Sequence, residues 1–139
     1  MAGSADTQVH DKLGSINKLT IDWTSDDATG AVTITTDEKI CGELIKVITN
    51  PSGTAAPDAN YDIVITDAEG FNVLSGMVAN LLNRHTANTE EVYFATAATN
   101  TVVPVVCDIL TISVANAGNS KEGRILLYWR GTVHENKRR

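Results

Sequence analysis

Two acidic stretches of this 139-residue chain contain the residue types best suited to a metal site or an active site. In "TDAEG", Asp67 and Glu69 precede a glycine between two apolar runs, and "DWTSDDATG" contains Asp22, Asp26 and Asp27. A calcium loop needs about six to eight oxygen ligands at regular positions, and neither stretch has that spacing. Asp at the start of a turn accepts hydrogen bonds from its own backbone, and Gly adopts the left-handed conformation easily. Both stretches therefore predict turns rather than metal sites.

A nucleophilic Ser–His–Asp triad can be assembled on paper from Ser75, His85 and Asp67. No G-x-S-x-G motif flanks a serine, and chance combinations of this kind are common. The chain also lacks a phosphate-binding loop, a dinucleotide fingerprint and zinc-ligand spacing. We therefore expect no enzyme activity, no catalytic or metal-binding residues and no cofactor.

The two cysteines, Cys41 and Cys107, have neither a CxxC motif nor Cys/His spacing. The first residues show no basic start followed by an apolar stretch, so we expect no signal peptide. No run approaches the ~20 apolar residues of a membrane span, so we expect no membrane partner. Both cysteines are therefore expected to be reduced and buried, with a disulfide between them as the alternative.

The chain is acidic overall, with 17 Asp and Glu residues against 11 Lys and Arg residues. An acidic body is a poor electrostatic footprint for nucleic acid, so we expect no nucleic-acid partner. Residues 132–139 form a basic C-terminal tail, "TVHENKRR". The tail is either a solvated end or a contact for an acidic neighbour or for phosphates.

Alternating apolar residues predict β-strands along most of the chain. Residues 1–16 have no sustained period and predict a flexible N-terminal arm. Residues 51–60 contain two prolines and are long enough for a crossover between two sheets. One short helix is expected within residues 76–90, where Met77, Val78, Leu81 and Leu82 have helical spacing. The expected strands are residues 18–23, 31–36, 43–50, 61–66, 90–96, one strand within 102–116, and 124–131.

These elements predict an all-β fold, a single-domain β-sandwich or jelly-roll-like barrel of about seven or eight strands with one short helix. The domain is expected to span residues 17–131, between the arm and the tail. The last strand is apolar on both faces, from Ile125 to Trp129. Such a strand is expected to be internal, covered by the second sheet on one side and by a neighbouring subunit on the other.

The order of several motifs resembles small virion structural proteins of tailed bacteriophages. The resemblance covers roughly residues 18–131, which is nearly the whole domain. Its motifs are the strand and corner with Tyr61, Asp62, Asp67 and Gly70, then "VLSG" at residues 73–76, and the loop "VANAGNSKEG" at residues 114–123. The resemblance implies a β-sandwich protein assembled on the particle, namely a capsid decoration or cement protein.

A decoration protein of this kind would be made in the host bacterial cytoplasm and located on the capsid surface of the virion. The resemblance implies a homotrimer that binds the outside of the head and bridges subunits of the major capsid protein. A flexible arm could become ordered on a neighbouring subunit. The candidate subunit or capsid contacts are Val9, His10, Leu13, Ile16, Arg84, Tyr128 and Trp129.

Three of these positions have alternative structural roles. Arg84 follows the expected helix, where it either pairs with an acidic partner chain or caps the last helical carbonyls. Tyr128 and Trp129 are either core residues or aromatic anchors of a subunit contact.

Three other functions remain open on the sequence. The first is a neck or tail-associated position in the same particle. The second is a carbohydrate- or receptor-binding β-sandwich module, although such modules expose aromatic side chains and this chain has only two Trp, three Tyr and two Phe. The third is a calcium-dependent binding module that rests on Asp22, Asp26 and Asp27.

Overall fold

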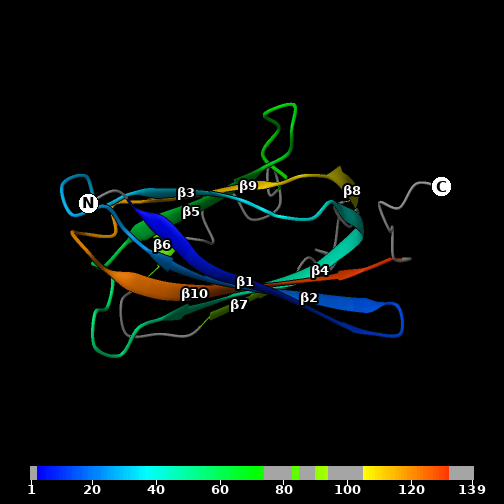
Figure 1. The fold of residues 1–139 in the computed structure, drawn as a ribbon, viewed down its shortest axis with the longest axis horizontal. Helices are drawn as coiled ribbons and strands as arrows, with labels where there is room; N and C mark the ends of the chain where they lie inside the picture. Colours follow the sequence, from blue (N-terminus) through cyan, green and yellow to red (C-terminus); the bar gives the residue numbers. More distant parts are fainter. Residues whose placement is uncertain (1–2, 74–82, 85–89, 94–104, 132–139) are drawn as a thin grey trace, which may run out of the picture.

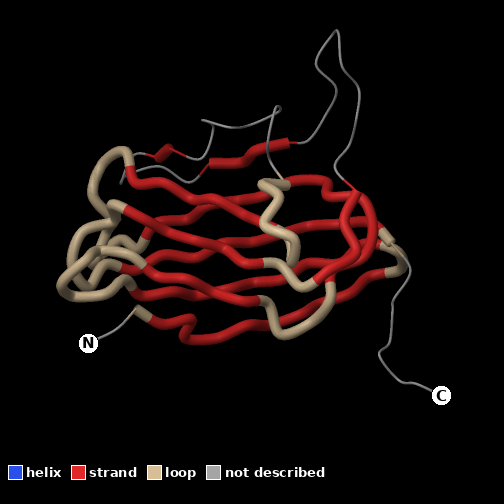
Figure 2. The backbone as a smooth tube through the Cα atoms, turned by 90° about the horizontal axis from the view of Figure 1, so that it is seen from above, coloured by secondary structure: helices blue, strands red, loops and turns tan. Residues whose placement is uncertain are grey.

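The chain folds into two facing layers of β-strands (Figure 1). The structure is a computed structural model, and it describes residues 3–73, 83–84, 90–93 and 105–131. The strands run side by side along the length of the molecule (Figure 2). In chain order they are β1 (Ser4–Leu13), β2 (Ile16–Thr24), β3 (Val32–Thr35), β4 (Ile40–Pro51), β5 (Tyr61–Thr66), β6 (Asn83–Arg84), β7 (Glu90–Tyr93), β8 (Val105–Asp108), β9 (Thr111–Ala115) and β10 (Glu122–Arg130).

Both sheets are antiparallel throughout, which confirms the prediction of an all-β fold. The larger sheet has six strands in the order β1-β2-β10-β4-β7, with β8 also paired to β4. The smaller sheet has four strands in the order β3-β9-β5-β6. The loop after β4 leads from the larger sheet to β5 in the smaller one, so the predicted crossover at residues 51–60 is confirmed.

Three segments differ from the expected elements, and the described residues contain no helix. Residues 102–116 supply two strands, β8 and β9, rather than one. Asn83–Arg84 pairs with the start of β5 as β6, so the described part of the segment expected to be helical is a strand. Residues 76–82 and 85–89 of that segment lie outside the described residues. Asparagine is a poor residue for a helix interior, which favours pairing with β5 instead.

The third segment is the expected flexible arm, which contains the edge strand β1. The strand β1 pairs with β2 through a hairpin at Gly14, which has a φ of 61°. Gln8 also ties β1 to the other sheet, because its Nε2 donates to the Thr35 carbonyl at 2.9 Å and its Oε1 accepts from the Asp37 N–H at 2.9 Å. The six-stranded sheet thus begins before residue 17. Most β1 side chains are exposed, so the strand needs no apolar alternation, and the sequence carried no clear signal for it.

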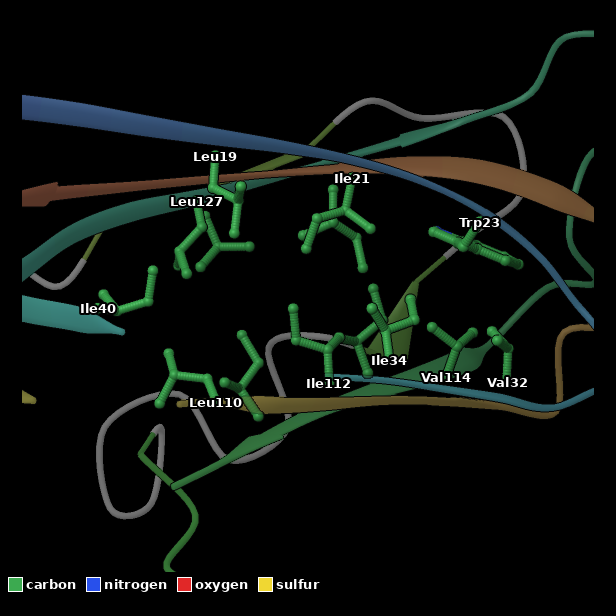
Figure 3. Packing of buried hydrophobic residues seen from close by; sticks show 14 of the residues in the cluster. Leu19, Ile21, Trp23, Val32, Ile34, Ile40, Leu110, Ile112, Val114 and Leu127 are labelled. Carbon is green, nitrogen blue, oxygen red and sulfur yellow. The ribbon is translucent and has the colours of Figure 1, made fainter. Parts of the chain in front are cut away.

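The core lies between the two sheets and is built from alternate residues of their strands. In β2 the inward residues Leu19, Ile21 and Trp23 are at most 3% exposed. They face Ile112 and Val114 of β9 across the interior (Figure 3). The strand periodicity of two places every second side chain on this face. Aliphatic side chains provide most of the core, as the low aromatic content predicts.

Cys41 and Cys107 are joined in a disulfide, which corrects the expectation that both are reduced. They lie directly opposite one another on β4 and β8, which are neighbouring antiparallel strands. The cysteines are 66 residues apart in the sequence. No local motif could report this pairing, because it depends on the register of two strands that fold together from distant parts of the chain.

Candidate assembly surface

The outward side of the six-stranded sheet is the best candidate for a functional surface. Residues directly opposite in antiparallel strands share a face, so the strand registers define rows across β1, β2, β10 and β4. We call the outward residues of these four strands the outer face. Its four rows are Thr7–Asp22–Arg124–Asn50, Val9–Thr20–Leu126–Ile48, Asp11–Lys18–Tyr128–Lys46 and Leu13–Ile16–Arg130–Glu43.

An apolar row crosses the middle of the outer face. Val9 is 50% exposed, and Leu126 and Ile48 are half-buried on the same row. Thr20 adds a methyl group between them. The strand β10 is therefore internal and apolar on both sides, as its sequence predicts, but none of the described residues forms a layer over its outward side.

Charged residues flank this apolar row on both sides. On one side, Arg124 donates to Asp22 through Nε at 2.5 Å and through Nη2 at 3.0 Å. On the other side, the Lys18 Nζ lies 3.9 Å from the Asp11 carboxylate, and the Lys46 Nζ lies 4.9 Å from the centre of the Tyr128 ring. Acidic and basic groups are thus interspersed on this face instead of forming a patch of one sign.

The Asp22–Arg124 pair shifts the pKa values of both side chains. Hydrogen bonding to the Arg124 guanidinium lowers the pKa of Asp22 from its ordinary value, although partial burial opposes this change. The Thr7 hydroxyl also donates to the Asp22 carboxylate at 3.1 Å, which lowers the pKa further. In return, Asp22 raises the pKa of Arg124. Both side chains therefore keep their charges over a wide pH range.

At one end of the outer face there is a shallow depression of about 280 Å³. Leu13 is 83% exposed beside it, and Ile16 and Tyr128 form part of its wall. Asp11, Lys12 and Lys18 complete the lining. A lining that combines apolar and charged side chains suits contact with another protein surface.

Four of the seven candidate contact residues lie together on the outer face. They are Val9, Leu13, Ile16 and Tyr128. His10 and Trp129 lie on the inward side, where their rings stack with centroids 5.3 Å apart, and Trp129 is only 3% exposed. Arg84 belongs to β6 in the smaller sheet, away from this surface, and its side chain lies outside the description.

His10 is held by polar neighbours at the edge of the core. Its Nε2 lies 3.1 Å from Oδ1 of the buried Asn17, and its Nδ1 contacts the Glu38 carboxylate. This arrangement fastens β1 to β2 and to the segment before β4. The structure therefore gives His10 and Trp129 a role in packing within the chain.

Sequence reasoning missed the residues that complete the outer face, above all Thr20, Leu126 and Ile48. The even-numbered residues of 16–24 and 122–130 alternate with the buried ones, which marks them as one face of each strand. Only the register between the two strands shows that these faces form one surface. Alternation within one strand shows which residues share a face, but it does not show which strand lies beside it.

In both acidic turns an aspartate accepts hydrogen bonds from backbone N–H groups of the same turn, which confirms the predicted turns. The Asp67 Oδ1 accepts from the N–H groups of Glu69 and Phe71, both at 2.9 Å, and Gly70 has a φ of 85°. The Asp26 Oδ1 accepts from the N–H groups of Ala28 and Thr29, both at 2.7 Å, and these bonds lower the pKa of Asp26.

Within the described part of the chain, no three His, Cys, Asp or Glu residues are grouped so that they could hold a metal ion. Asp22 is engaged with Arg124, and Asp26 accepts from backbone N–H groups of its own turn. Ser75 and His85, which the hypothetical triad requires, lie outside the described residues. The described ranges also contain no helix long and apolar enough to cross a membrane.

The chain matches no protein-family model, and comparison with curated proteins and with solved structures finds no similar protein.

Proposed function

We propose that this chain is a structural protein of a bacteriophage virion, a capsid decoration protein that binds the outside of the head and stabilises it by bridging major capsid subunits. The observation that carries the proposal is the outer face, an apolar row bordered by charges of both signs on an antiparallel sheet. A surface of this kind suits stable contact with another subunit and offers no reactive group.

The proposal also includes a specific architecture for the two sheets. We take the two facing sheets to be a β-sandwich with jelly-roll-like connections, the architecture implied by the resemblance to small phage structural proteins. The crossover after β4 and the return of β10 between β2 and β4 are compatible with such connections. A body of this kind can carry load on a capsid without a catalytic pocket.

The disulfide supports a location on the particle surface. Disulfides persist in oxidising surroundings, including the surfaces of virions, and are rare in proteins that stay in the cytosol. A protein made in the host cytoplasm and carried outside on the head could form the Cys41–Cys107 bond after release. Cross-linking β4 to β8 would then stabilise the exposed protein against unfolding.

Co-sedimentation with phage heads tests this function. Purified protein is mixed with heads of its phage that were prepared without it, and the pellet is analysed at increasing protein concentrations. Saturable binding to the heads supports a decoration protein. Binding to isolated necks or tails, with none to heads, would instead support the neck or tail position.

A carbohydrate- or receptor-binding module is the second candidate, and one observation favours it. Phe71 is 73% exposed at the corner that Asp67 closes, and exposed aromatic rings are common in sugar-binding surfaces. A glycan array with the wild-type protein and Phe71→Ala tests this alternative. Binding that is lost in Phe71→Ala would favour the module, and no binding to any glycan would remove it.

A further inference from the structure

The rows of the outer face are chemically self-complementary about a two-fold axis. Consider a two-fold axis that lies in the plane of the outer face, parallel to the strands, between β2 and β10. Rotation about it brings a second copy face to face with the first. The rotation places β2 opposite β10 of the partner and β1 opposite β4 of the partner, while each row meets the same row.

The charged rows become complementary under this rotation. In the first row, Asp22 of each copy meets Arg124 of the other, so that the two intrachain ion pairs lie antiparallel. In the third row, Asp11 meets Lys46 of the other copy, and Lys18 meets the Tyr128 ring. Attraction between an ammonium group and an aromatic face adds to this contact.

The other two rows are also compatible. In the apolar row, Val9 meets Ile48 of the other copy and Thr20 meets Leu126. In the last row, Ile16 meets the aliphatic stem of Arg130, whereas the exposed Leu13 meets Glu43, so this row contributes less than the others. No row brings two charges of the same sign together, although the chain carries a net charge of −6.

The size of the outer face is sufficient for a specific but weak contact. Four strands about 4.8 Å apart and four rows about 6.7 Å apart span roughly 19 Å by 27 Å, or about 500 Å² per copy. Two copies would together bury about 1,000 Å², which is where specific interfaces begin. Aligned sheets pack at about 30°, so the residues nearest the axis, on β2 and β10, would meet most closely.

We infer that the outer face binds a second copy of this chain in an isologous, two-fold dimer. The inference goes beyond the proposed function, because it names a second copy of the chain as the direct partner of this face. Such a dimer would contact the head through its remaining exposed surfaces. A two-fold pair also differs from the homotrimer that the resemblance implies, so the copy number separates the two arrangements.

Sedimentation velocity on two charge-reversal variants tests the inference. In Asp11→Lys, each copy would place a lysine against Lys46 of its partner, and in Lys46→Glu each copy would place a glutamate against Asp11. Like charges in an interface oppose association strongly, so each variant is expected to raise the dimer dissociation constant at least about tenfold. Thr33→Lys, on the exposed outward side of β3, is the matched control and is expected to dimerise like the wild type.

An equal mixture of the two variants provides the decisive comparison. In the mixed dimer, the lysine introduced by Asp11→Lys would meet the glutamate introduced by Lys46→Glu, and the unchanged Lys46 of the first copy would meet the unchanged Asp11 of the second. We therefore expect the mixture to recover dimers that neither variant forms alone, at low ionic strength where charges are least screened. Circular dichroism of each variant verifies that it is folded.

Three results would overturn the inference: a wild-type protein that is monomeric or trimeric, dimers that neither reversal weakens, or a mixture that recovers none. An axis that runs across the strands along the apolar row would place Asp11 against Thr7 and Lys46 against Asn50, so it predicts the second of these results. Because no heads are present, the outcome is independent of the proposed function. Dimers that do not bind heads would refute only that function, and bound monomers would refute only this inference.

Discussion

Removing the Cys41–Cys107 disulfide is expected to lower the stability of the protein substantially. The change is the double variant Cys41→Ser/Cys107→Ser, which leaves both strands with small polar residues. The bond closes a loop between residues that are 66 positions apart in the sequence. In the chain-entropy description, a cross-link of this span reduces the entropy of the unfolded chain enough to contribute about 4 kcal/mol at 25 °C.

The assay is equilibrium unfolding in urea, followed by circular dichroism. A chain of this size has an m value of about 2 kcal/mol/M, so the midpoint of the double variant is expected to fall by about 2 M. Wild-type protein in excess reductant is the matched control, because it lacks the bond but keeps both sulfur atoms. It is expected to unfold near the double variant.

Two results would refute this reasoning. Native protein purified without reductant that titrates with two free thiols would show that the bond does not form. A double variant whose free energy of unfolding lies within about 1 kcal/mol of the oxidised wild type would show that the bond does not restrict the unfolded chain as the chain-entropy description requires.

Two further substitutions test packing and electrostatics. Gly123→Ala would place its Cβ 2.6 Å from the Trp23 ring, so we expect a loss of about 1–3 kcal/mol in urea unfolding, whereas Gly53→Ala, with no atom within 4 Å, should change stability little. Equal effects of the two would contradict the packing. Asp22→Asn removes a carboxylate whose pKa the Arg124 guanidinium lowers. Because that pKa is lower in the folded than in the unfolded chain, the stabilisation is present above about pH 4 and is lost as the pH falls through the folded value. Solvent screening limits the loss at about pH 7 to at most about 1 kcal/mol. A difference between variant and wild type that grows as the pH falls below about 4 would contradict this.

Local patterns in the sequence were sufficient to predict the class of fold and most of the strands. The inward residues of β2, β5 and β9 alternate clearly because each strand has one buried side. The crossover at residues 51–60 could be predicted because this segment has no apolar period and contains Pro57, which cannot donate a hydrogen bond to a neighbouring strand. The turns at Asp26 and Asp67 could be predicted because their hydrogen bonds involve only neighbouring residues.

Features that depend on pairing between distant strands could not be predicted in this way. The edge strand β1 has few buried residues, and its identity comes from hydrogen bonding to β2 and from Gln8 contacts with the other sheet. The disulfide requires the register of β4 against β8. The outer face requires three registers at once, so only partial clues, such as the two-sided apolar character of β10, were available in the sequence.

The most direct test of the account compares head binding by Leu126→Asp and Thr33→Asp. Leu126 lies in the apolar row of the outer face, and Thr33 lies on the exposed outward side of the other sheet. Each folded variant is titrated onto heads prepared without the wild-type protein, and the bound fraction is measured by sedimentation. If the outer face is the surface of assembly, either by contacting the head or by pairing the copies that bind to it, Leu126→Asp should bind at least about tenfold more weakly than the wild type. Burying an unpaired carboxylate is costly in either contact, while Thr33→Asp should bind normally. Equal binding by the two variants, or no binding of the wild type to heads, would contradict the account.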